Sequence, residues 1–201
     1  MILEGIVTTV NENGELNIAP MGPRIGPGPG LERFELRPYR TSTTFRNLKA
    51  LGEGVFHVTD DVGLLARAAI GAELSPSPPL RPAERVRGWI LDGSCHYYEF
   101  RAVAMDDREE RASVVVETVA EGRLRDFLGF NRARNAIVEA AILATRTAFL
   151  PRREILADFD RFSVIVAKTG GPAEEEALQL LRRHVLQAPE HADPGQIVKS
   201  S

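Results

Sequence analysis

The segment from Arg37 to Leu48 is the part of the sequence that most favours binding of an anion. It reads Arg-Pro-Tyr-Arg-Thr-Ser-Thr-Thr-Phe-Arg-Asn-Leu, with hydroxyl groups and arginines gathered where a strand-like run gives way to a helical one. The first turn of a helix presents unpaired N–H groups and the positive end of the dipole, which favour an anion such as a phosphate monoester. Plain capping by Ser42 or Thr43, with solvated arginines, explains the same residues, so both interpretations stay open.

Histidine and cysteine chemistry is weakly supported by the sequence. The histidines are His57, His96, His184 and His191, which lie on separate predicted elements without a local ligand pair, so we predict no metal site. Cys95 precedes His96, and neighbours in a strand point to opposite faces, so the two cannot act as nucleophile and base for each other. We interpret Cys95 as a buried structural thiol.

Two further patterns have plain structural interpretations. The run from Gly26 to Gly30 alternates glycine with proline and precedes a strand instead of a helix, so we interpret it as a surface connector and not as a phosphate-binding loop. Paired carboxylates occur at Asp60-Asp61 and at Asp106-Asp107. The first pair is predicted to include a helix cap and the second to lie at a hairpin tip, so neither is expected to serve as a general acid or base.

The elements that position these residues divide into a strand-rich part and a helical part. Strands are expected over residues 2–10, 16–21, 31–39, 54–59, 85–91, 96–105 and 112–119, with a hairpin turn at Asn11 to Gly14. Helices are expected over 43–51, from Asp60 or Asp61 to Ile70, over 131–148, from Pro151 to Gly170, and between Gly171 and Ala188. The proline-rich residues 72–84 are expected to form a long irregular loop.

Composition narrows the class of protein. The chain has 201 residues, with 25 Lys and Arg against 28 Asp and Glu, for a net charge of -3. This balance argues against a protein whose affinity for nucleic acid rests on neutralising phosphates. No apolar run approaches the roughly 18 residues needed to span a bilayer, and we identify no signal peptide, so no membrane partner is expected. A single cysteine suits a reducing compartment, and a cytoplasmic location is expected.

Three short segments resemble the FMN-binding split barrels of the flavin reductase-like superfamily. They are Asn17-Ile18-Ala19-Pro20-Met21-Gly22, the stretch from Arg40 to Leu48, and Gly54-Val55-Phe56-His57-Val58-Thr59-Asp60-Asp61. Within that superfamily the chain is most similar to the family called domain of unknown function 447, whose helical C-terminal part residues 130–139 also resemble. The resemblance implies an α+β fold, a six-stranded antiparallel Greek-key split β-barrel with a C-terminal helical part. We expect an FMN-binding domain at 1–122, the helical part at 123–188 and a flexible tail at 189–201.

The resemblance also implies a cofactor site, with FMN held noncovalently near the interface of a homodimer. Carried over by position, the residues along the edge of the flavin ring are Ala19, Pro20, Met21 and Gly22. Those holding phosphate and ribitol are Arg40, Ser42, Thr43, Thr44 and Asn47, and Arg132 is a candidate cation near the pyrimidine side. The implied activity is that of a flavin-dependent oxidoreductase with a small-molecule electron donor or acceptor and no assigned catalytic residue. The alternatives are a non-catalytic flavin carrier or sensor, a structural dimer with a decayed flavin site, and a protein for another phosphate ester such as pyridoxal phosphate.

Overall fold

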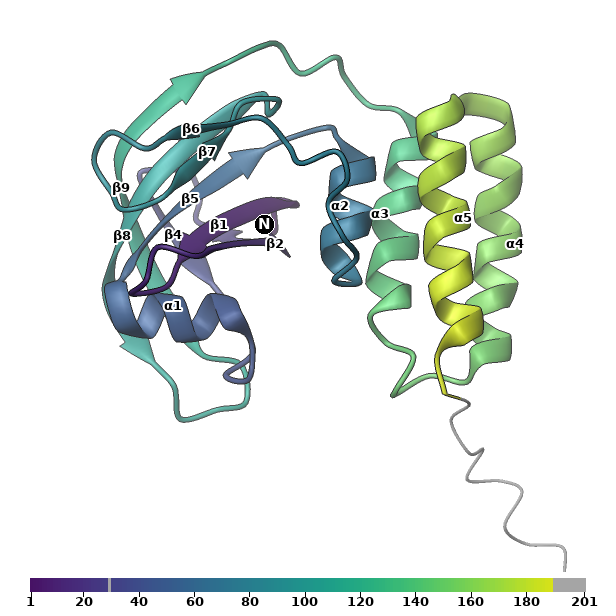
Figure 1. Ribbon diagram of the computed structural model, residues 1–201, viewed down its shortest axis with the longest axis horizontal. Helices are drawn as coiled ribbons and strands as arrows, with labels where there is room; N and C mark the ends of the chain where they lie inside the picture. Colours follow the sequence, from purple (N-terminus) through teal and green to yellow (C-terminus); the bar gives the residue numbers. More distant parts are fainter. Residues whose placement is uncertain (29, 190–201) are drawn as a thin grey trace, which may run out of the picture. The chain divides into compact units, whose positions relative to one another are not determined.

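The computed structural model describes residues 1–28 and 30–189, which form two compact units (Figure 1). The first unit comprises Met1–Asp61 and Ser75–Leu128, and the second comprises Val62–Leu74 and the described residues from Gly129 on. Except for Pro189, the expected tail lies outside the described residues.

The first unit is built on one antiparallel sheet with the strand order β2-β1-β5-β8-β9-β4-β3. Its strands are β1 (Gly5–Val10), β2 (Leu16–Met21), β3 (Arg24–Ile25), β4 (Arg33–Leu36), β5 (Glu53–Val58), β8 (His96–Asp106) and β9 (Ser113–Arg123). A separate pair is formed by β6 (Leu80–Pro82) and β7 (Trp89–Leu91), and α1 (Thr43–Leu51) packs against β1, β2 and β5. The predicted α+β class with an antiparallel barrel is confirmed, although the sheet has seven strands instead of six.

The sheet curls until its far edge meets the start of the chain (Figure 1). Ile2 bridges Arg24 of β3, and the N–H of Ile25 donates to the carbonyl of Met1 at 2.9 Å. Gly22 lies beside this closure, where an added Cβ would come within 2.7 Å of the Ile2 side chain, so glycine permits the close approach. Six strands, from β1 through β5, β8, β9 and β4 to β3, form the curled wall, and β2 extends it as a free edge.

The interior of the barrel is apolar and aromatic. Phe34 lies 5.8 Å from Phe56 and 5.7 Å from Phe100 between ring centroids, and these side chains come from three different strands. Every residue of β1 is buried, which explains why its sequence shows no alternation of apolar and polar side chains. The expected hairpin turn is present: the Asn11 side-chain oxygen accepts from the N–H groups of Asn13 and Glu15.

The second unit is a group of four helices, α2 (Val62–Ala69), α3 (Arg132–Ala144), α4 (Arg152–Thr169) and α5 (Pro172–Gln187). Helix α3 packs against each of the other three. Its predicted stripe of small residues is buried at Ala133, Ile137, Ala140 and Ala144. Ala148 is exposed instead, because α3 ends at Ala144.

The structure corrects several sequence-based expectations. The loop expected over 72–84 contains strand β6, and β3 lies just before the run from Gly26 to Gly30; both strands are too short to produce a periodic pattern. The strand expected over 85–91 is confined to Trp89–Leu91, because the N–H groups of Arg85 and Val86 donate to the Glu99 carboxylate instead of to a neighbouring strand. Helix α2 packs against α3 and α5. Within the described residues, no helix combines the length and apolar character needed to cross a membrane.

Candidate functional site

Ser42 begins the helix that carries the candidate anion site. Its hydroxyl accepts from the N–H of Phe45 at 3.1 Å and donates to the carbonyl of Tyr39 at 2.7 Å, which makes it the N-cap of α1. The first turn of α1 contains no acidic residue, so nothing within that turn competes for its positive end. The capping interpretation therefore holds for Ser42, while the turn that it caps stays suited to an anion.

The exposed side of the first turn carries two arginines. Arg46 folds back along the helix, donating to the Thr43 hydroxyl at 2.8 Å and to the carbonyl of Thr41 at 2.8 Å. Arg40 is exposed in the preceding link, where its backbone N–H donates to the carbonyl of Glu110 at 3.0 Å. Lys49 and, more weakly, Arg40 lower the pKa of Asp107. Arg40 and Arg46 are thus both exposed near the start of α1, which suits phosphate.

On the opposite side of α1, Thr44 and Asn47 form an interior polar cluster with Thr9 of β1 and Asn17 of β2. The Asn17 amide donates to the hydroxyls of Thr9 at 3.2 Å and Thr44 at 3.1 Å, and the Asn47 amide donates to Thr9 at 3.0 Å. Thr44 and Asn47 are only 2% and 4% exposed. These two predicted phosphate residues therefore anchor α1 to β1 and β2. Thr9 and Asn17 were not predicted, because each pairs with residues far away in the sequence.

Strand β2 supplies the predicted ring-edge residues. Ala19, Pro20 and Met21 are half-buried in this edge strand, with Ala19 opposite Val7 of β1. A proline lacks the N–H that an inner strand needs, so its presence fits an edge. The bond between Asn17 and Thr44 places the beginning of β2 beside the first turn of α1. Apart from Arg132, an exposed residue at the start of α3, all predicted cofactor-binding residues lie in the first unit.

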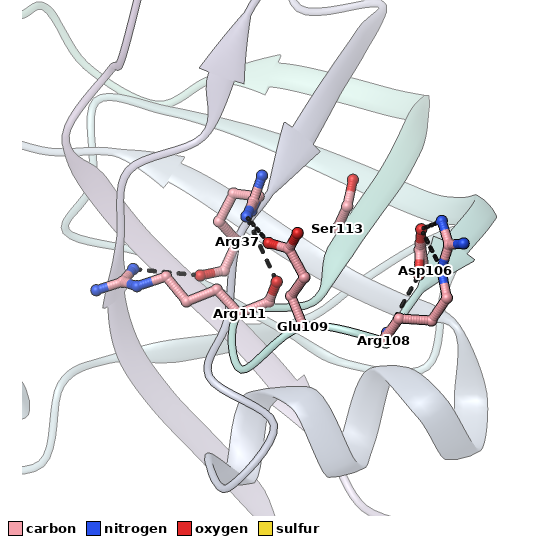
Figure 2. Close-up of a pocket in the computed structure, with 6 residues that line it drawn as sticks. All are labelled: Arg37, Asp106, Arg108, Glu109, Arg111 and Ser113. Atoms are coloured by element: carbon pink, nitrogen blue, oxygen red, sulfur yellow. Dashed lines mark hydrogen bonds and ion pairs between the residues drawn. The ribbon is translucent and has the colours of Figure 1, made fainter.

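A pocket of about 440 Å³ lies where the turn between β8 and β9 meets the link between β4 and α1 (Figure 2). We call it the arginine pocket; it is lined by Arg37, Asp106, Arg108, Glu109, Arg111 and Ser113. Asp106 lies at the end of the hairpin, as expected, and is paired with Arg108. Hydrogen bonds from Arg108 lower the pKa of Asp106 to about 2, so its carboxylate is charged at neutral pH.

Sequence comparison assigns nearly the whole chain to one family. The model described as "Protein of unknown function (DUF447) N-terminal domain" matches residues 3–125, and the model described as "Protein of unknown function (DUF447)" matches residues 131–183. The chain belongs to the DUF447 family. No curated protein matches it.

Solved structures share the fold of this DUF447 chain. The FMN-bound DUF447 protein MM1853 from Methanosarcina mazei is 20% identical, with a TM-score of 0.77 over 91% of this chain and 94% of its own. A nitrilotriacetate monooxygenase component B homologue from Mycobacterium thermoresistibile is 17% identical, with a TM-score of 0.51 over 63% of this chain and 71% of its own. The NADH:FAD oxidoreductase SgcE6 from Streptomyces globisporus is 11% identical, with a TM-score of 0.50 over 61% and 70%. The likeness to MM1853 extends through both units, whereas the other two cover about the barrel's share of the chain.

Two titratable residues of the DUF447 chain are built into the barrel. His57 is fully buried, with Nδ1 3.2 Å from the carbonyl of Ile6, and its Nε2 accepts from the N–H of Leu91 at 3.1 Å. Burial lowers the pKa of His57 to about 4, so the ring is neutral at pH 7. Cys95 is buried as predicted, and burial, followed by the nearby Asp60 carboxylate, raises the pKa of its thiol. Both residues have structural roles.

Glu99, which was not predicted from the sequence, holds the connection between β6 and β7 in place. Its carboxylate is fully buried and accepts from the N–H groups of Glu84 at 2.9 Å, Arg85 at 2.6 Å and Val86 at 3.2 Å. The three backbone N–H groups replace the hydrogen bonds to water that the carboxylate loses when it is buried. Glu99 therefore fixes the connection between β6 and β7 against the barrel. No local pattern in the sequence indicates such a contact.

Proposed function

We propose that this DUF447 chain binds FMN along β2 and the first turn of α1 and works as a flavin-dependent oxidoreductase. The observation that carries the proposal is the acid-free start of α1, with Arg40 and Arg46 exposed, held beside the edge strand β2. FMN is favoured over other phosphate esters because MM1853, which shares the fold and family, is described as FMN-bound. Binding of pyridoxal phosphate is the alternative to test.

The phosphate of FMN fits the exposed side of α1. Arg40 and Arg46 bring positive charge, and the Thr43 hydroxyl already lies within hydrogen-bond distance of Arg46. The N–H of Phe45 is taken by the Ser42 cap, so the N–H groups of Thr43 and Thr44 are the first-turn donors that an anion meets. Ser42, Thr44 and Asn47 then act by holding this turn in place.

The ring of FMN is assigned to the edge of β2. The main chain of Ala19, Pro20 and Met21 lies along one side of it, with Gly22 beyond the end of the strand. When bound, FMN supplies a two-electron acceptor at N5, and the protein orients it and sets its electrostatic surroundings. Arg132 lies in the second unit, and its assignment as a cation near the pyrimidine side stays a prediction from the sequence. We also propose that two copies associate, with the barrel as the flavin domain.

The first test is a titration of the purified chain with FMN and with riboflavin, followed by flavin fluorescence. We expect micromolar or tighter binding of FMN, about -8 kcal/mol, and binding of riboflavin weaker by about tenfold or more because it lacks the phosphate. A double variant, Arg40→Ala with Arg46→Ala, is expected to lose most of the preference for FMN, and the first-turn N–H groups of α1 keep a small remainder. Arg33→Ala is the matched control, because Arg33 is an exposed arginine of β4 that pairs with Glu117.

The outcomes separate the candidate functions. Absence of saturable FMN binding would refute the flavin proposal, and tighter binding of pyridoxal phosphate would redirect it. If FMN binds, NADH and NADPH oxidation is measured with the FMN-loaded protein and an electron acceptor. Turnover above that of free FMN supports an oxidoreductase, whereas unchanged turnover with tight binding indicates a carrier or sensor.

A further inference from the structure

The arginine pocket has a firmly held frame. The N–H of Ala112 donates to the carbonyl of Pro38 at 3.0 Å, and Tyr39 bridges Arg111, so the β4–α1 link continues as a short ladder beside the β8–β9 turn. On the other side, Lys49 of α1 pairs with Asp107 of the turn at 2.8 Å. The walls are therefore set by backbone pairing, and a ligand need not order them.

Two arginines of the pocket differ in how well the protein satisfies them (Figure 2). Arg108 binds Asp106 through Nε at 2.9 Å and Nη2 at 2.5 Å, which is a complete two-pronged pair. Among the residues that the structure describes, the Arg37 side chain has only long contacts, at 3.5 Å to Glu35, 3.5 Å to the carbonyl of Arg111 and 3.9 Å to Glu109, and its buried Nε has no hydrogen-bond partner there. Charge-assisted pairs of this type usually lie at about 2.7–2.9 Å, so Arg37 retains capacity for an anion.

Glu109 is the carboxylate that faces Arg37 from the pocket side (Figure 2). Its side chain is 84% exposed, so the 3.9 Å contact is a weak and solvated ion pair. Ser113, at the back of the pocket, donates to Glu35, which keeps that carboxylate directed toward the sheet. Because this ion pair is long and solvated, a phosphate can compete with Glu109 for Arg37.

We infer that the arginine pocket is a second anion site, which takes the phosphate group of a small phosphate monoester. Arg37 binds the phosphate in place of Glu109, while Arg108, which also lines the pocket, stays paired with Asp106. The pocket volume of about 440 Å³ is within the range of small-molecule sites and leaves room for an organic group beyond the phosphate. This site is separate from the FMN phosphate at α1, and it does not depend on FMN binding.

The test is an amide NMR titration of the full chain with glycerol 3-phosphate at constant ionic strength, with glycerol as the uncharged match. It is run without FMN and with saturating FMN, so a failure of FMN binding leaves this measurement intact. We expect saturable shifts at the amides of Arg111, Ala112 and Ser113 in both cases, and none with glycerol. Arg37 lies three residues from Arg40, which is no more than about 10 Å along the chain. The amides that shift therefore show whether the phosphate binds in the arginine pocket or at the start of α1.

Three single variants sharpen the result. Arg37→Gln should weaken binding about tenfold or more, because the cation assigned to bind the phosphate is lost. Glu109→Gln, on an exposed turn where folding is not at risk, should tighten binding about threefold by removing the competing carboxylate. Glu110→Gln is the matched control and should leave affinity unchanged. Shifts confined to the amides of Thr43 to Phe45, equal effects of the two glutamate variants, or no saturation would each overturn the proposal.

Discussion

Two groups of polar side chains lie near α1 and differ in one respect. In the interior polar cluster, each amide donates to a hydroxyl at 3.0 to 3.2 Å, and the bonds join α1, β1 and β2 to one another. In the arginine pocket, Arg37 has only long contacts and an unpartnered Nε. The first group is complete without a ligand and stabilises the fold; the second is incomplete and suits a ligand. Whether the polar groups already have close hydrogen-bond partners, more than their residue type, distinguishes the structural group from the candidate ligand site.

The same criterion applies to His57 and Glu99. Both residue types are common in catalytic sites, but each is fully buried and all its observed partners are backbone groups. Loss of either should therefore lower stability and leave ligand binding in the folded protein unchanged.

The largest effect concerns His57 and pH. Its pKa is about 4 when folded, below the ordinary 6.5, so the unfolded chain binds the proton more tightly. The stability from this group is complete above about pH 6.5 and falls as the pH is lowered to 4, by about 3 kcal/mol in total. Urea unfolding at a series of pH values measures the slope. The variant His57→Asn should lack this component; the same slope in both proteins would contradict the assignment.

Glu99→Gln should have the next largest effect. The amide keeps the shape of the side chain but offers one acceptor oxygen where the carboxylate offers two, so at least one of the N–H groups of residues 84–86 loses its partner. We expect a loss of about 2 kcal/mol in the free energy of unfolding. Glu121→Gln, at an exposed position of β9, is the control. Equal stability of the two variants would mean that water replaces the lost acceptor.

Asn17→Ala tests the interior polar cluster. It removes the hydrogen bonds to Thr9 and Thr44 and should cost about 1 kcal/mol. Because Asn17 positions α1 without being assigned to contact the flavin, the variant should also reduce the preference for FMN over riboflavin. Asn13→Ala, in the β1–β2 turn, is the matched control and should retain that preference. A variant that is less stable but has an unchanged flavin preference would limit the cluster to a structural role.

The sequence predicts those parts of the barrel whose signals are local. The Asn11 turn, the Ser42 cap and the small-residue stripe of α3 each depend on neighbours within a few residues, and each is present. Strands β3 and β6 were not predicted, because strands of two and three residues produce no periodic pattern.

The candidate site shows the same limit. The hydroxyl run at residues 41–44 indicates a helix start, but it does not show that Thr43 faces solvent while Thr44 faces Asn17. Nor can local spacing indicate that the β8–β9 turn lies beside Arg37, since their contact joins residues more than 70 positions apart. Residue types thus pointed to an anion near α1, and only the tertiary contacts separate the anchoring residues from the exposed ones.

Arg46→Ala should have the smallest effect on stability. Its bonds to Thr41 and Thr43 are exposed, so the free energy of unfolding should change by less than about 0.5 kcal/mol. Its effect should instead appear in FMN binding and in the salt dependence of that binding, because each cation near the phosphate adds a screened attraction. FMN titrations at low and high salt, with riboflavin as the phosphate-free reference, measure both. A large loss of stability with an unchanged salt dependence would place Arg46 with the structural residues and remove it from the phosphate site.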